Sequence, residues 1–282
     1  MDNTVAKHYN QRPELGTEHR KQSPIFQMKS LNNFIKSLLI SKFSRPGYTV
    51  LEIACGKGGD LLKWKQARIR ELVAMDIADV SVQQAEERYQ KGRMPFKATF
   101  KALDCFSERL EAEIKGWVFD IVSIQFAFHY AFSSEERVRQ SIRIISNGMR
   151  SGGYFLGTIP NSIIIVQKLR EHGLEFGNSV YKIRFEQEKL DPPFGLRYWF
   201  ELLDAIDDCP EYLIPQPILI SIAKEYGLEL VLLEPFHKFF YENYEYSLDL
   251  MKRMNIFDAD GKIPIDQWEA SGLYSAFCFR KI

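Results

Sequence analysis

Short apolar runs alternate with amphipathic stretches along the first half of the chain. The pattern predicts strands at Tyr48–Ala54, Glu71–Met75, Thr99–Leu103, Phe119–Gln125 and Tyr154–Ile159. The stretches between them predict helices at Asp60–Gln66, Val80–Lys91 and Ser134–Met149. Strands and helices in this order form a mostly parallel sheet with helices on both faces. We therefore expect an α/β fold.

The flanking regions follow other patterns. Helical spacing predicts a helix at Gln27–Phe43, which Arg45-Pro46-Gly47 ends. After residue 160 we expect strands at Val180–Phe185, Tyr198–Ala205, Leu228–Leu233 and Ser275–Arg280, and a helix at Pro215–Tyr226. Asp207-Asp208 is interpreted as an acidic loop. No Pro/Ser-rich linker interrupts the chain, so we expect one domain over 1–282: a basic helical segment (1–47), a core (48–159) and a completing part (160–282).

Composition and charge exclude several classes of function and kinds of site. Formal net charge is zero over 282 residues, which argues against a nucleic-acid binder held by bulk electrostatics. The four cysteines form no CxxC pair, so we expect free thiols and no metal site. The polar start lacks an apolar signal region, and no run of about 18 apolar residues exists, so neither a signal peptide nor a membrane span is expected.

The loop after the first predicted strand, ACGKGGD, carries the candidate cofactor chemistry. Glycines let a backbone approach a ligand and turn into a helix. The phosphate-binding pattern GxxxxGK[ST] is absent, and GxGxxG is matched except that Ala54 replaces its first glycine. Asp76 ends the second strand 20 residues after Gly56. An acid there binds ribose hydroxyls in enzymes that use NAD and in those that use S-adenosylmethionine (SAM).

The ends of the next strands favour SAM. Asp104-Cys105 follows the third strand, and Gln125-Phe126 ends the fourth. In SAM enzymes the adenine lies beside an acid or amide after strand three, and the substrate lies after strand four. The spacing Glu52-x-x-x-Gly56 is also usual for methyltransferases. NAD, and a glycine turn without any ligand, remain the alternatives at this point.

Longer blocks resemble the cellular mRNA cap guanine-N7 methyltransferases. The blocks are VAKHYN (Val5–Asn10), SPIFQMKSLNNFIKSLLI (Ser23–Ile40), LEIACGKGGDLLKWK (Leu51–Lys65), MDIADVSVQQAEERY (Met75–Tyr89), SIQFAFHYAF (Ser123–Phe132), PEYLIP (Pro210–Pro215) and LYSAF (Leu273–Phe277). The resemblance implies a Rossmann-like class I SAM-dependent methyltransferase fold with an added N-terminal helix and C-terminal elements. Residue 54 departs from the pattern, since the family usually has glycine there.

The implied reaction transfers the methyl group of SAM to N7 of the 5′ cap guanine. N7 carries a lone pair and no proton, so an in-line displacement needs alignment and no general base. We therefore expect no acid/base catalytic residue and no metal. A SAM methyltransferase for a small molecule or another RNA base is the alternative. A degenerate fold that binds capped RNA without turnover is a third hypothesis.

The resemblance also implies site residues. Those expected to position the guanine are Phe126, His129, Tyr130 and Glu211. Further expected cap contacts are Asn32, Asn33, Lys57, Lys63, Arg88 and Tyr274. The expected cofactor contacts are Lys36, Ala54, Gly56, Asp60, Asp76, Asp104, Cys105, Gln125 and Tyr130. Capped RNA is the expected partner, and other capping enzymes or the transcription machinery are candidates. We expect a monomer, no membrane association and, from the family, a nuclear location.

Overall fold

A seven-stranded sheet forms the centre of the molecule in the computed structural model, which describes residues 10 and 22–282. Its strand order is β10-β11-β5-β4-β1-β2-β3, and only β11 runs antiparallel to both of its neighbours. The strands are β1 (Thr49–Ile53), β2 (Glu71–Asp76), β3 (Lys97–Ala102), β4 (Phe119–Gln125), β5 (Met149–Pro160), β10 (Leu228–Pro235) and β11 (Tyr274–Lys281). The expected mostly parallel sheet is thus confirmed.

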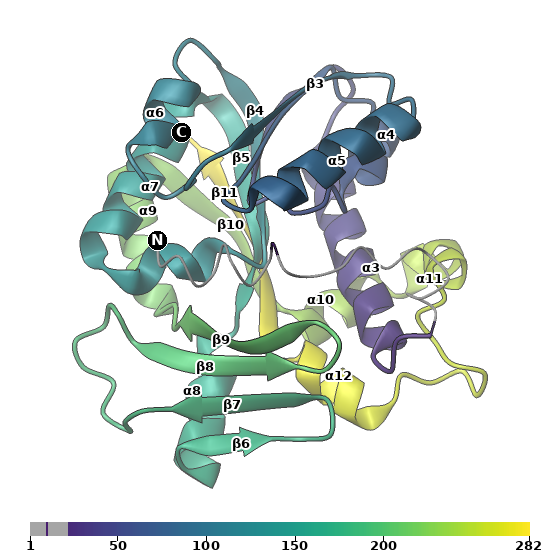
Figure 1. Ribbon diagram of the computed structural model, residues 1–282, viewed down its shortest axis with the longest axis vertical. Coiled ribbons are helices and arrows are strands. Elements are labelled where there is room, and N and C mark those ends of the chain that lie inside the picture. Colours follow the sequence, from purple (N-terminus) through teal and green to yellow (C-terminus); the bar gives the residue numbers. More distant parts are fainter. Residues whose placement is uncertain (1–9, 11–21) are drawn as a thin grey trace.

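Helices cover both faces of this sheet, as predicted. They are α3 (Phe26–Phe43), α4 (Leu61–Ala67), α5 (Asp79–Lys91), α6 (Arg109–Glu113), α7 (Glu135–Gly148), α9 (Gln216–Glu225) and α10 (Phe236–Asn243). Figure 1 shows α7 and α9 against one face, and α3 and α4 against the other. Every residue of β1 is buried, which is expected for a parallel strand covered on both sides. The Val5–Asn10 block lies outside the described residues except for Asn10.

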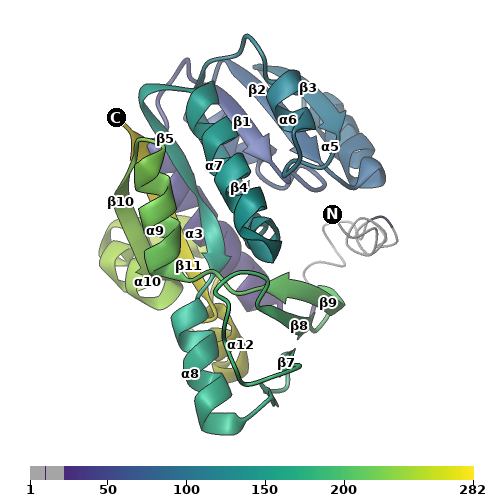
Figure 2. The ribbon, with the colours of Figure 1, turned by 90° about the vertical axis from the view of Figure 1, so that its left-hand side faces the viewer.

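A second, antiparallel sheet has the order β6-β7-β8-β9. Its strands are β6 (Glu175–Gly177), β7 (Tyr181–Phe185), β8 (Arg197–Leu202) and β9 (Ile206–Tyr212). Figures 1 and 2 both place it beyond one end of the central sheet. The acidic-loop interpretation of Asp207-Asp208 was wrong, because both residues belong to β9. As β9 is an edge strand, both carboxylates stay exposed while Cys209 and Glu211 are buried.

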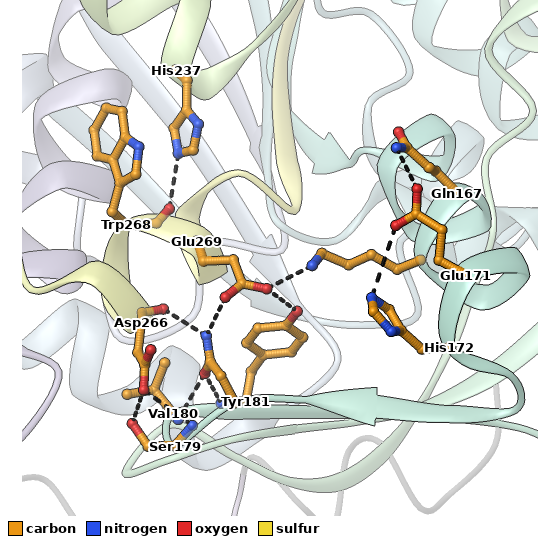
Figure 3. Close-up of polar contacts among 12 residues, drawn as sticks. Gln167, Glu171, His172, Ser179, Val180, Tyr181, His237, Asp266, Trp268 and Glu269 are labelled. Atoms are coloured by element: carbon orange, nitrogen blue, oxygen red, sulfur yellow. Dashed lines mark hydrogen bonds and ion pairs between the residues drawn. The ribbon is translucent and has the colours of Figure 1, made fainter.

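Several helices had no predicted counterpart. Besides α6 and α10, they are α8 (Ser162–His172), α11 (Leu248–Met254), α12 (Ile265–Ser271) and the 3-10 helices η1 (Phe128–Ser133) and η2 (Glu245–Ser247). Glu269 of α12 accepts from Lys168 Nζ of α8 at 2.6 Å and from the Tyr181 hydroxyl of β7 at 3.0 Å (Figure 3). These contacts fix the small sheet to the C-terminal helices. Among the described helices, none combines the length and apolar character that crossing a bilayer requires.

Candidate functional site

A cavity of about 230 Å³ lies where β1, β2 and β4 end. Ligands in open α/β sheets bind at these carboxyl ends. Its lining comes from the glycine loop, from the segments after β2 and β3, and from the turn after β4: Ala54, Gly56, Asp76, Ile77, Ser81, Cys105, Phe106, Gln125, Phe126, Ala127 and Tyr130. Seven of these were predicted from the sequence as cofactor or cap residues. The glycine loop and the strand ends therefore meet around one hollow.

Asp76 anchors the glycine loop. Its Oδ2 accepts the N–H of Gly56 at 2.8 Å, and its Oδ1 accepts the N–H of Ala78 at 2.8 Å. Burial raises the pKa of this carboxyl, although the backbone donors oppose the rise. Each oxygen retains a lone pair, so the carboxylate can also accept from hydroxyl donors of a ligand in the cavity.

The backbone of the loop explains its glycines. Gly58 has φ +71°, and a Cβ there would lie 2.8 Å from Leu61 Cδ1 and 3.2 Å from Ala85 Cα. Gly58 therefore lets α4 and α5 pack closely beside the loop. Ala54 has φ +55°, a region that favours glycine. The residue that departs from the family pattern thus occupies a strained position in the cavity wall.

Four predicted residues meet in a partly buried cluster where α3 packs against α4. Asp60 Oδ1 lies 2.7 Å from Lys36 Nζ and 2.6 Å from Lys63 Nζ. Lys63 also donates to Asn33 Oδ1 at 3.0 Å. Burial would raise the pKa of Asp60, but the two ammonium groups outweigh it and lower the pKa to about 2. The ammonium of Lys63, predicted to face cap phosphates, is here occupied by protein acceptors.

Glu52 adds a second carboxyl to this cluster. Its Oε2 accepts the indole N–H of Trp64 at 2.9 Å. Burial, reinforced by the charge of Asp60, raises the pKa of Glu52 to about 8. The predicted Glu52-x-x-x-Gly56 spacing therefore places a largely protonated acid beneath the loop at neutral pH.

Polar side chains also support the predicted residues after β3 and β4. Asp104 accepts the N–H of Phe106 at 3.0 Å and pairs with Arg137 at 3.3 Å. Burial acts to raise the pKa of Asp104, but these contacts outweigh it and lower the pKa. Gln125 donates to Ser123 Oγ at 3.0 Å. Arg137 and Ser123 were not predicted, because nothing in the sequence marks which polar side chain will meet a distant strand end.

Aromatic rings close the far end of the cavity. Phe126 has φ +58°, and its N–H donates to the Thr158 carbonyl at 3.0 Å. Its ring meets that of Tyr274 perpendicularly, with centroids 4.9 Å apart. The rings of His129 and Tyr130 are also close, with centroids 4.1 Å apart. The predicted aromatic residues thus form two ring pairs, each of which contributes one residue, Phe126 or Tyr130, to the cavity lining.

His129 and Glu211 face each other beside these rings. The Nε2 atom of His129 is 3.7 Å from Oε1 of Glu211, and both residues are buried. Neither ring nitrogen of His129 has a hydrogen-bond partner within the described part of the chain. Burial lowers the pKa of His129 to about 3 and raises that of Glu211 to about 7. A neutral imidazole and a carboxyl group are thereby held together without bonding each other.

The remaining predicted cap residues do not line the cavity. Lys57 is half-buried in the glycine loop, and Arg88 is exposed on α5. Arg88 follows Ala85 by three residues, so it lies on the side of α5 that packs against Gly58. Asn32 of α3 holds a buried Oδ1 that lacks a hydrogen-bond partner among the described residues.

Comparison with known proteins identifies the family. The model of the mRNA (guanine-N(7))-methyltransferase domain matches residues 1–282. The chain belongs to this family. The resemblance stated from sequence blocks is therefore confirmed, and membership implies SAM as methyl donor.

Relatives named mRNA cap guanine-N(7) methyltransferase align over nearly the whole chain. The protein of Cryptococcus neoformans (strain JEC21) is 45% identical over 99% of this chain and 47% of its own length. That of Schizosaccharomyces pombe is 43% identical over 98% of this chain and 81% of its own length. That of Saccharomyces cerevisiae is 37% identical over 100% and 70%. The chain thus spans less than half of the Cryptococcus relative.

Solved structures confirm the fold at low sequence identity. The CcbJ methyltransferase from Streptomyces caelestis has TM-score 0.56 at 13% identity, with 98% of this chain and 96% of that chain covered. A putative SAM-dependent methyltransferase from Listeria monocytogenes has TM-score 0.56 at 14% identity, with 90% and 99% covered. The predicted Rossmann-like class I methyltransferase fold is correct.

Proposed function

We propose that this chain transfers a methyl group from SAM to N7 of the 5′ cap guanine of mRNA. The observation that carries the proposal is the pair of His129 and Glu211 beside the cavity. Guanine offers O6 as an acceptor and N1–H and the 2-amino group as donors. A neutral imidazole can donate to O6, and a carboxylate can accept from the other two groups. Family membership and the pair support the same substrate.

The cavity fits SAM by its chemistry. Asp76 would hold the ribose hydroxyls, since each of its oxygens keeps a lone pair after binding the loop N–H groups. Asp104 and Cys105 would lie at the adenine side, and Ala54, Gly56 and Gln125 would line the remainder. Lys36 and Asp60 would stabilise the loop from behind and lie toward the methionine part. SAM would supply an electrophilic methyl group on a sulfonium.

The chain's own residues would align and stabilise the reaction. Phe126 and Tyr130 would stack against the guanine, an interaction worth roughly 1–3 kcal/mol per base. Glu211 would stabilise the positive charge that develops on the methylated ring. Since N7 has no proton to lose, no residue acts as a general base. Catalysis would rest on proximity, orientation and electrostatics in a water-poor pocket.

Phosphate contacts are proposed around the glycine loop. Lys57 and Arg88 would meet the triphosphate, and Tyr274 would cover the base. Asn32 and Asn33 would contact the cap from α3. Lys63 would reach a phosphate only if it released Asp60 or Asn33, so its proposed contribution is to position Asn33. Capped RNA is the proposed partner of a monomeric, metal-independent enzyme in the nucleus, alongside other capping enzymes or the transcription machinery.

The direct test uses GpppN-capped RNA and SAM labelled in its methyl group. Nuclease digestion should yield labelled 7-methylguanosine. Absence of this product while SAM binds would contradict the proposal. A small-molecule methyltransferase would not respond to GpppG as a competitor, whereas a cap enzyme should be inhibited. Cap binding without turnover would identify a degenerate fold.

A further inference from the structure

Tyr198 of β8 and Glu211 of β9 form a buried cross-strand pair. The two residues lie directly opposite each other in the antiparallel register. The Tyr198 hydroxyl donates to Glu211 Oε2 at 2.6 Å, and the residues are 1% and 4% exposed. Tyr198 packs against Phe185 of β7, with ring centroids 5.5 Å apart. A ring held between strands therefore presents its hydroxyl to the carboxylate from a fixed direction.

We propose that Tyr198 is a positioning residue for cap recognition, which orients the carboxylate of Glu211 through the hydrogen bond to Oε2. The inference rests on the proposed function. A free glutamate rotates about three side-chain bonds, and a bond of one oxygen to a fixed hydroxyl removes much of this freedom. Oε1 faces His129 at 3.7 Å, beyond hydrogen-bond distance, so this oxygen keeps its lone pairs for a ligand. Oε2 keeps one lone pair beside the hydroxyl.

Among the described residues, the hydrogen-bond donor identified for Glu211 is the Tyr198 hydroxyl. His129 of η1 faces Oε1, and burial lowers its pKa to about 3, so it is neutral near pH 7. Cys209 of β9 and Tyr274 of β11 also lie close enough to affect Tyr198 electrostatically. Burial raises the pKa of Glu211 to about 7, and the hydrogen bond from Tyr198 opposes the rise.

The consequence is a dependence of cap recognition on pH. Only the ionised carboxylate can accept both guanine donors, so activity should fall as pH drops through the pKa of Glu211. Removal of the Tyr198 hydroxyl eliminates the interaction that lowers this pKa. The acidic limb of kcat/KM for capped RNA, which reports groups of the free enzyme, should then move to higher pH.

The test compares Tyr198→Phe with Tyr181→Phe in the full chain. Tyr181 is a matched control because it lies in the neighbouring strand β7, is buried, and donates to a carboxylate, Glu269, at 3.0 Å away from the cavity (Figure 3). Tyr198→Phe should raise KM for capped RNA about tenfold or more and shift the acidic limb upward. Tyr181→Phe should change neither. Binding of SAM, measured by calorimetry, should be similar in both variants.

A second set of variants, made in a chain that carries Glu211→Gln, separates a positioning role of Tyr198 from a loss of packing. In the Glu211→Gln background the acidic limb should disappear, and Tyr198→Phe should add less than twofold to KM, because the pair acts as a unit. Calorimetry with GpppG repeats the comparison without turnover, and thermal unfolding checks that each variant folds. A wild type that forms 7-methylguanosine, with Tyr198→Phe no different from Tyr181→Phe, overturns the inference. A wild type without product overturns the proposed function itself.

Discussion

His129 and Glu211 approach to 3.7 Å between Nε2 and Oε1 without forming a hydrogen bond. Two buried polar groups that face each other in this way are costly unless a ligand bonds to them. The imidazole comes from η1, after β4 of the central sheet, and the carboxylate comes from the small sheet. The small sheet therefore contributes the acceptor, and the central sheet the donor, of one recognition site.

Glu211→Ala should abolish cap methylation while SAM binding survives. The substitution removes the acceptor for N1–H and the 2-amino group, and it leaves the cavity at the strand ends intact. We expect kcat/KM for capped RNA to fall by about a hundredfold or more, as for a buried hydrogen-bonded charge. Steady-state kinetics and calorimetry with SAM measure the two properties. Loss of SAM binding together with activity would contradict the assignment of Glu211 to the cap.

Asp76→Ala should weaken SAM binding first. The carboxylate fixes the Gly56 N–H and is the proposed ribose acceptor, so its removal disturbs the loop and the ligand contact together. We expect the Kd of SAM to rise about tenfold or more. Asp79→Ala, at the start of α5, is the control because that side chain is exposed. Equal SAM affinities of the two variants would show that Asp76 does not contact the cofactor.

Gly58→Ala should destabilise the loop. The new Cβ would lie 2.8 Å from Leu61 Cδ1 and adopt φ +71°, so crowding and backbone strain add to about 2–4 kcal/mol of lost unfolding free energy. Gly59→Ala is the matched control, since nothing lies within 4 Å of its Cβ position. Urea unfolding compares the two. Similar midpoints would mean that the close packing of the loop against Ala85 is not required.

Glu52→Gln should change how stability depends on pH. The folded-state pKa of about 8 lies above the ordinary value of 4.5, so the folded chain binds more protons between these values. Wild-type stability should therefore fall as pH rises from 5 to 9, and Glu52→Gln should lose less, by roughly 2 kcal/mol or more. Trp64 can still donate to the amide oxygen. Parallel pH profiles for the variant and the wild type would contradict the shifted pKa.

Much of the fold could be predicted from local pattern. All five early strands occur: four of them are short apolar runs that are largely buried, whereas β3 is a partly exposed edge strand. The later helices were missed for physical reasons: α8 begins with β-branched isoleucines, and α11 and α12 have only 7 residues each. In β9, exposed acids at an edge strand have the composition of a loop.

Part of the candidate site could likewise be predicted from the sequence, and part of it could not. Residues at strand ends, such as Asp76 and Gln125, could be predicted because topology brings those ends together. Tyr198 could not, because its importance comes from the register of two strands, which no local pattern specifies. The cluster of Asp60 with Lys36 and Lys63 was also hidden. It depends on the packing of α3 against α4, which sets the contact between residues 24 positions apart in sequence.

The central claim is that the methyl group of SAM is transferred to N7 of the cap guanine. It is most directly tested by replacing that nitrogen atom. Capped RNA in which the guanine N7 is a CH group keeps O6, N1–H and the 2-amino group, so it should bind with an affinity similar to that of GpppN-capped RNA. We expect methyl transfer from SAM to the ordinary cap and none to the 7-deaza cap, which should act as a competitive inhibitor. Equal methyl incorporation into both RNAs would show that another atom accepts the methyl group and would contradict the account.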